Sequence, residues 1–236
     1  MTGLTLNLAL ISLIGGLLSL DRRAAMQLML SQPLVAVSLL GVIMGYPDYG
    51  VLLGCLLQLI WMSCVLFGAN VPRNDTLASV TIGGVCFLYA IHVHPLDSAT
   101  WTLAILLGVP VCVLGQWMDI KLDHLNLGLA AKADQAALEG NTRAISFCVF
   151  QAILRIFLVN ATAVAVTTAA LLYLLVIIRN RLDASSLNAL GIIGVYLIPA
   201  LGIAVALSLL RHRRGLALAA IAFVIVSTVI AQGQLQ

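Results

Sequence analysis

The chain has 236 residues, of which 62% are hydrophobic and 9% are charged, and its mean hydropathy is +1.11. A soluble domain carries about 25% charged residues, so the composition excludes an ordinary soluble enzyme and indicates a polytopic membrane protein. The net charge is +3, but the basic residues lie in short loops between apolar stretches. That distribution is typical of membrane topology and not of a nucleic-acid-binding surface.

The first apolar stretch, residues 4–20, is of minimal length for a membrane-spanning helix. No basic residue precedes it, so we expect a retained span and not a cleavable signal peptide. Asp21, Arg22 and Arg23 end this span. Residues 24–30 then form a short connector with helical character.

Residues 32–79 combine a short apolar piece, a Gly/Pro break and a polar cluster. The first piece, residues 33–45, reaches only about 20 Å as a helix, whereas the hydrocarbon core is about 30 Å thick. The second piece, residues 50–68, is long enough to cross but carries the amide of Gln58 near its middle. Irregular backbone is tolerated at membrane depth only where protein or a wet cavity satisfies it, so we expect a re-entrant, cavity-lining hairpin. The polar loop that follows contains Asn70, Arg73, Asn74 and Asp75.

The remainder of the chain alternates apolar spans with polar connections. Gly and Pro residues within the span at residues 187–210 predict a kinked or discontinuous helix. Residues 119–143, which follow the span at residues 99–118, predict an amphipathic helix that is broken at Gly140 and Asn141. A surface helix that ends near Arg155 follows it, before the span at residues 156–178. The expected spans are residues 77–93, 99–118, 156–178, 187–210 and 215–231.

The basic cluster at residues 211–214, RHRR, is the strongest positive-inside signal in the chain. Placing it in the cytoplasm puts residues 119–155 inside and residues 179–183 outside. The predicted fold class is therefore an all-α polytopic membrane protein that forms a single membrane domain, residues 1–236. It has about six or seven transmembrane helices, at least one re-entrant hairpin and an amphipathic cytoplasmic helical segment at residues 119–155.

Gln58 is the first candidate for a binding residue. An amide inside a span is unfavourable unless it is hydrogen-bonded, and such residues usually face a bundle interior or a cavity. Because an amide both donates and accepts, it matches a sugar hydroxyl. The alternative is that Gln58 only joins neighbouring helices. For the polar loop that follows, the alternative is an ordinary solvated loop, with Asp75 capping the next helix.

No self-sufficient catalytic site is expected. His92 and His94, with Asp97 nearby, have a spacing that metal ligands can use, but no further ligand cluster accompanies them, and we interpret them as interfacial histidines. The sequence lacks a Ser/His/Asp constellation, a phosphate-binding glycine loop and an HExxH motif. The five cysteines lie in or beside apolar runs without a pairing pattern and are expected to be small packing residues. We expect no metal, cofactor or catalytic residue.

Residues 32–80 resemble the IIC subunit of the mannose/fructose/sorbose family of the bacterial phosphoenolpyruvate-dependent sugar phosphotransferase system. The segments that carry the resemblance are QPLVAVSLLGVIMG, YPDYGVLLGCLLQLIWM and GANVPRNDTLAS, and the later run ADQAALEGNTRAIS is also similar to that family. Two departures affect the expected sugar specificity. Gln58 stands where the family has an acidic residue, and the family's proline-aspartate pair is shifted to Pro72 and Asn74 or Asp75.

The resemblance implies a multi-pass protein of the bacterial inner membrane that conducts a hexose-type sugar. Its expected partners are a IID membrane subunit, cytoplasmic IIA and IIB proteins and membrane lipid, in an oligomeric assembly. In this family a histidine on IIB phosphorylates the sugar at the inner face, so the present chain is expected to be a non-catalytic subunit that carries no phosphorylated residue.

The expected mechanism places the hairpin and the polar loop on one wall of a midplane cavity. Gln58, Asn70 and Asn74 hydrogen-bond sugar hydroxyls, Gln32 joins them at the start of the hairpin, Asp75 accepts a further bond or caps a helix, and Arg73 positions the loop. Rigid-body movement of this wall alternates access. The alternatives are a secondary transporter without phosphotransferase coupling, a scaffold subunit that no longer conducts sugar, and an intramembrane metalloenzyme that uses His92 and His94.

Overall fold

The computed structural model describes residues 2–25, 27–62, 71–208, 217 and 221. Within these residues all regular structure is helical and five segments are long and apolar enough to cross a membrane, which confirms the predicted all-α membrane fold. The last predicted span, residues 215–231, lies almost entirely outside the described residues. The helices are α1 (Thr2–Arg23), α2 (Pro33–Met44), α3 (Pro47–Trp61), α4 (Asp75–His92), α5 (Ser98–Gly108), α6 (Val111–Leu138), α7 (Thr142–Arg181), α8 (Ala184–Ile192), η1 (Ile193–Leu197, a π-helix) and α9 (Ile198–Ser208).

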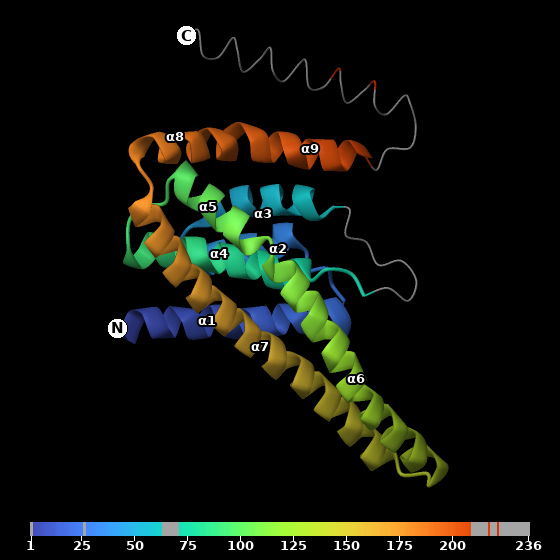
Figure 1. Ribbon diagram of the computed structural model, residues 1–236. Coiled ribbons are helices and arrows are strands. Elements are labelled where there is room, and N and C mark those ends of the chain that lie inside the picture. The colour runs from blue at the N-terminus through green and yellow to red at the C-terminus, as the bar shows by residue number, and fades with distance from the viewer. Residues whose placement is uncertain (1, 26, 63–70, 209–216, 218–220, 222–236) are drawn as a thin grey trace.

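Helix α4 forms the centre of the bundle, and α1, α2, α5 and α7 pack around it (Figure 1). Every residue from Thr76 to Tyr89 is buried. Small residues allow this close packing: a Cβ added to Gly84 would lie 2.9 Å from the Ile11 side chain of α1. A helix that is apolar on all sides is expected at such a position, so α4 is the fixed element against which the others are arranged.

Helices α2 and α3 form the short hairpin that the sequence predicts. They have 12 and 15 residues, so as helices they reach about 18 and 22 Å, less than the thickness of the hydrocarbon core. The sequence predicts a second piece, residues 50–68, that is long enough to cross, but the described helix ends at Trp61 and residues 63–70 lie outside the described residues. Gly45 ends α2 in the left-handed conformation, with φ of 83°, which glycine adopts without steric cost. A Cβ on Gly41 would lie 2.6 Å from the Cα of Gly50, so the two helix backbones touch at their crossing.

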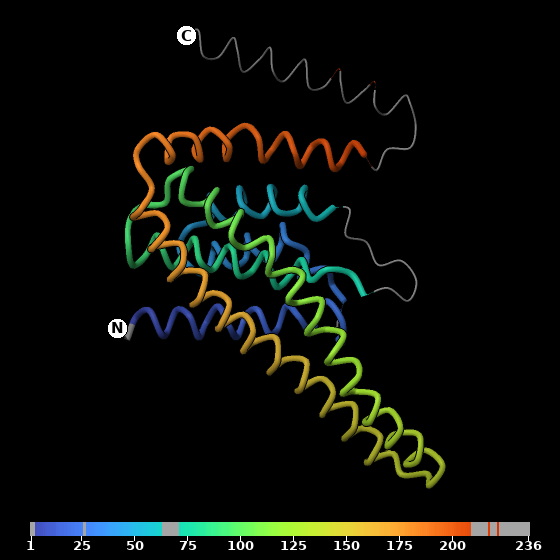
Figure 2. The backbone as a smooth tube through the Cα atoms, in the orientation of Figure 1, coloured from blue at the N-terminus to red at the C-terminus, as the bar shows by residue number. Residues whose placement is uncertain are grey.

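The polar stretch after residue 118 is not a separate amphipathic helix. It is the second half of α6, which runs unbroken for 28 residues from Pro110 at its N-cap. The predicted division near Arg155 is also absent, because α7 continues for 40 residues. No glycine–asparagine or proline break interrupts either helix, and the predicted break at Gly140 and Asn141 is confirmed as the turn between them. The second half of α6 and the first half of α7 extend together beyond the other helices (Figure 2).

Helices α8, η1 and α9 form one continuous helical run, Ala184–Ser208, with a local irregularity and no break, where the sequence predicts a kinked or discontinuous helix for residues 187–210. The irregularity is the π-helical segment η1, directly before Pro199 of α9. Gly194 of η1 sits against the side chains of Trp101 and Thr102 of α5, where any larger residue would clash. α9 also packs on α3, through Gly202 and Leu59, and therefore covers the outer side of the α2–α3 hairpin.

Candidate functional site

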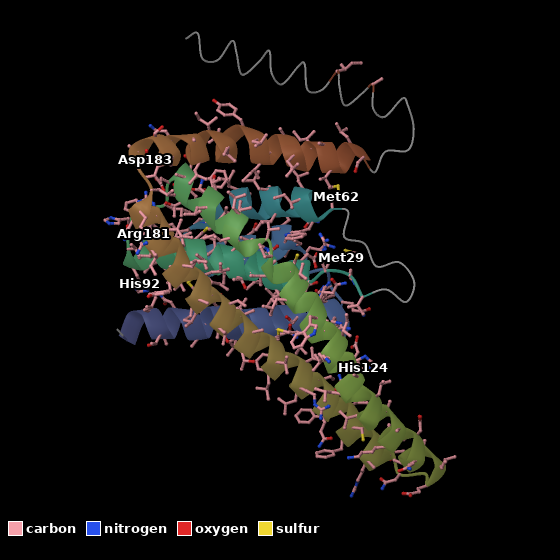
Figure 3. All side chains as sticks on the ribbon, in the orientation of Figure 1. Met29, Met62, His92, His124, Arg181 and Asp183 are labelled. Atoms are coloured by element: carbon pink, nitrogen blue, oxygen red, sulfur yellow. The ribbon has the colours of Figure 1, made fainter. Side chains whose placement is uncertain are left out.

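A cavity of about 520 Å³ lies where the end of α1, the connector after it, the end of α3 and the start of α4 meet. This volume is within the range of about 300 to 1,000 Å³ that small-molecule sites occupy. Met29 and Met62, which Figure 3 labels, both line the cavity. Its polar lining residues are Asp21, Arg22, Gln27, Ser31, Gln32, Gln58, Asp75 and Thr76. Three of the predicted binding residues, Gln32, Gln58 and Asp75, therefore come together here.

Gln58 and Gln32 form an amide pair at one side of the cavity. The Gln58 Nε2 atom donates to Gln32 Oε1 at 2.8 Å, and Gln58 Oε1 accepts from the backbone N–H of Leu34 at 3.2 Å. The second bond satisfies one of the N–H groups that α2 leaves free in its first turn. Gln58 thus joins α3 to α2 and also faces the cavity. An amide nitrogen carries two hydrogens, so each of the two amides keeps donor capacity for a ligand.

Asp75 is held at the cavity by Arg22. Arg22 Nε lies 3.3 Å from Asp75 Oδ1, and its Nη1 lies 3.0 Å from Asp119 Oδ2. Its Nη2 donates to the backbone carbonyl of Arg73 at 2.9 Å. Arg22 is therefore committed to two carboxylates and one carbonyl. One of these contacts, from Nε, holds the Asp75 carboxylate at the cavity, and a carboxylate has further acceptor sites for a ligand.

Asp119 is the buried centre of an ionic cluster, which we define as Arg22, Arg23, Asn74, Asp75, Asp119 and Asp123. The Asp119 side chain is 2% exposed, and its Oδ1 lies 3.0 Å from Arg23 Nη1. Asn74 Nδ2 also donates to Asp119 Oδ2 at 3.0 Å. Arg23 makes a further pair with Asp123 at 2.7 Å. A buried charge is tolerated when it is paired and hydrogen-bonded, and the ionic cluster joins α1, α4 and α6 in this way.

Asn74 and not Asp75 caps helix α4, which corrects the sequence interpretation by one residue. The Asn74 Oδ1 atom accepts from the N–H of Leu77 at 2.8 Å, three residues along the chain, as N-cap residues do. Asp75 is then the first helical residue, where the positive end of the helix favours a carboxylate. Asn74 is 2% exposed and is not among the residues that line the cavity, so it supports Asp75 and does not face the cavity.

The other predicted loop residues contribute differently. The Arg73 side chain is exposed, and the part of Arg73 that joins the site is its backbone carbonyl. Asn70 lies outside the described residues. Sequence reasoning treated Asp21 only as the end of the first span, yet its two oxygens accept from the N–H groups of Leu28 at 2.6 Å and Ser31 at 3.0 Å. Asp21 therefore shapes the connector that forms the cavity edge. An acidic residue that ends an apolar span is normally a topology signal, so the sequence did not distinguish this role.

His92 lies at the opposite end of the molecule from Met29 (Figure 3), and His94 and Asp97 follow it within five residues along the chain. His92 Nε2 lies 3.2 Å from Asn7 Nδ2. Asp97 pairs with Arg179 at 2.8 Å and caps α5 through Thr100. Burial raises the pKa of Asp97, but the bonds from Thr100 and Arg179 outweigh it, so the pKa lies below its usual value. No group of three or more His, Cys, Asp or Glu side chains with metal-binding geometry occurs in the described residues.

The family model of the sorbose-specific IIC component of the phosphotransferase system matches residues 5–232. The chain belongs to this IIC family. Among curated relatives, the mannose-specific EIIC component of Escherichia coli (strain K12) is 29% identical over 116 residues, which are 49% of this chain and 41% of that protein. The sorbose-specific EIIC component of Lacticaseibacillus casei is 28% identical over 137 residues, which are 58% of this chain and 45% of that protein. Each match thus spans less than half of the relative.

Two solved structures share the fold of this IIC protein. One is described as a membrane protein, with a TM-score of 0.71 and 22% identity, and the likeness covers 100% of this chain and 92% of that one. The other is a cryoEM structure of the mannose transporter ManYZ in complex with microcin E492, with a TM-score of 0.59 and 20% identity, covering 100% and 96%. The family and the apolar helices together establish a multi-pass inner-membrane component of a sugar phosphotransferase system.

Proposed function

We propose that this IIC chain is the sugar-translocating subunit of its permease, and that it binds a hexose-type sugar in the cavity at the start of α4. The observation that carries the proposal is the convergence of Gln32, Gln58 and Asp75 on one cavity of about 520 Å³. The amides offer donors, and Asp75 offers a carboxylate acceptor that Arg22 holds at the cavity. A hydroxyl group both donates and accepts, so a polyhydroxylated ring matches this lining.

The chain supplies binding and passage, whereas the phosphoryl group comes from a partner. In this proposal a IIB protein receives the phosphoryl group from IIA and phosphorylates the sugar at the inner face. A IID subunit completes the membrane complex. The mannose transporter ManYZ, whose structure shares this fold, supports an assembly with a second membrane chain. Exposed apolar side chains on α1, α7 and α9 offer surfaces for lipid and for neighbouring subunits.

The test is phosphoenolpyruvate-dependent phosphorylation of labelled hexoses and hexosamines by membranes that contain this chain and IID, with IIA and IIB added. We expect phosphorylation of at least one sugar, and none when the chain is omitted. Gln58→Ala should abolish it, because Gln58 joins the hairpin to the cavity. Asn188→Ala removes an exposed amide of α8 outside this cavity and should leave activity unchanged.

The other outcomes separate the alternatives. Sugar uptake that needs the chain but not phosphoenolpyruvate would overturn the coupling and support a secondary transporter. An intact complex that neither binds nor phosphorylates any sugar would support a non-conducting scaffold. Unchanged activity of Gln58→Ala, with normal membrane insertion, would remove Gln58 from the binding site.

A further inference from the structure

Trp61 has a buried polar atom that lacks a partner. It is the last residue of α3, is 5% exposed and lines the cavity. Its indole Nε1 atom is buried and has no hydrogen-bond partner among the described residues. A buried tryptophan N–H usually finds a partner, and one without a partner is unfavourable. A residue that lines the cavity therefore carries an unsatisfied donor.

The position of Trp61 distinguishes it from the other groups of this kind. In the described part of the chain, two further buried side-chain atoms have no partner, the hydroxyls of Ser79 and Thr168. Both lie within long helices, and neither residue lines the cavity. Trp61, in contrast, follows Gln58 by three residues, so the two side chains lie on one face of α3. The unsatisfied donor thus lies beside the predicted hydroxyl-binding amide.

We propose that Trp61 is a sugar-binding residue that selects a closed pyranose ring. The proposal rests on the sugar-binding function of the cavity. One face of a pyranose is formed by C–H groups while its rim carries hydroxyls. The indole supplies a flat apolar surface for that face, and Gln32, Gln58 and Asp75 supply polar groups for the rim. The Nε1 atom itself is buried, so in this proposal the indole turns as the sugar enters and then donates to a sugar oxygen.

The experiment compares Trp61→Phe with Trp61→Ala in the purified complex with IID. Phenylalanine keeps an aromatic ring and removes the N–H, so we expect the dissociation constant of the bound hexose to rise about 2- to 12-fold, the value of one neutral hydrogen bond. Alanine also removes the ring and should weaken binding further. The sugar-free Trp61→Phe protein loses no hydrogen bond, because Nε1 has no partner, so a decrease in its melting temperature reports only the smaller ring. A purely structural tryptophan would lower the melting temperature without changing the dissociation constant.

Trp101→Phe is the matched control. Trp101 is also 5% exposed, but it packs against Gly194 of η1 and does not line the cavity. We expect its substitution to leave the dissociation constant unchanged. In a Trp101→Phe and Trp117→Phe background, Trp61 is the remaining tryptophan of the three in the chain. Its emission should then change when sugar is added.

The probes are mannose and sorbose, with mannitol and sorbitol as acyclic hexitols. We expect either hexitol to bind more weakly than the hexose that the complex recognises, because an open chain presents no C–H face to the indole. Equal binding of hexitol and hexose would overturn the ring selection. Wild-type affinity of both Trp61 variants would overturn this inference alone. Binding of no hexose by the wild-type complex would overturn the proposed function itself, so the two failures are distinguishable.

Discussion

Asp119→Ala should be one of the most destabilising single substitutions in this protein. The Asp119 side chain is 2% exposed and bonds Arg22, Arg23 and Asn74, each at 3.0 Å. Removing one partner of a buried ion pair costs about 3–5 kcal/mol. The lower end applies here, because Arg22 keeps Asp75 and Arg23 keeps Asp123. Since about 1 kcal/mol shifts the melting temperature of a chain this long by about 2–4 °C, we expect a decrease of about 6–12 °C.

The measurement is thermal unfolding in a single detergent, followed by tryptophan fluorescence. Asp123→Ala is the matched control, because it also removes a carboxylate that pairs with Arg23, but its side chain is 50% exposed. An exposed pair contributes about 0–1 kcal/mol, so the control should shift the melting temperature by no more than about 4 °C. Equal small shifts for both variants would refute the reasoning, because they would show that the ionic cluster adds nothing beyond a surface pair.

Two further predictions concern the α2–α3 crossing and the far end of the molecule. Gly41→Ala should destabilise the fold by about 1–3 kcal/mol, because the new Cβ meets the Gly50 backbone. Gly128→Ala, where the new Cβ meets no atom within 4 Å, should instead stabilise α6 by about 0.5–1 kcal/mol. Chemical denaturation measures both changes in the free energy of unfolding, and equal effects would contradict the prediction. The pKa of Asp97 is lowered on folding, because the bonds from Thr100 and Arg179 outweigh the effect of burial. These bonds contribute stability above the unfolded value of 3.8, and that contribution is lost as pH falls through the lower folded value. The difference in melting temperature between wild type and Asp97→Asn should therefore be constant near neutral pH and shrink below pH 3.8; a difference that persists at lower pH would exclude the pair as its source.

The sequence predicted those parts of the site that local chemistry marks. Gln58 is an amide within an apolar run, and residues 33–45 are too few to cross the bilayer, so both stand out without knowledge of the fold. The ion pair between Arg22 and Asp119 cannot be recognised from the sequence, because 97 positions separate the two residues and charges at the end of a span normally report topology. Asn74 and Asp75 are equally good N-cap residues, so only the geometry of Leu77 decides between them.

The length of α6 was not predictable for a related physical reason. An amphipathic pattern identifies a helix and its polar face, but it does not show whether that helix is independent or continues from the span before it. The break that the structure uses is at Val109 and Pro110, inside the predicted span of residues 99–118. Once α6 has started there, nothing before Gly140 ends it. The same reasoning applies to Arg155, which bonds Leu125 and Asn126 from within an uninterrupted α7.

The continuity of α6 has a mechanical consequence. Asp119, whose partner Arg22 lines the cavity, and Leu138, at the far tip, belong to one continuous helix, and the 19 residue steps from one to the other correspond to about 28 Å at 1.5 Å per residue. If the helix pivots at Asp119, a tilt of about 10° displaces Leu138 by about 5 Å, close to one helical turn. Any rearrangement of Arg22 and Asp75 that tilted α6 in this way would therefore be amplified at Leu138.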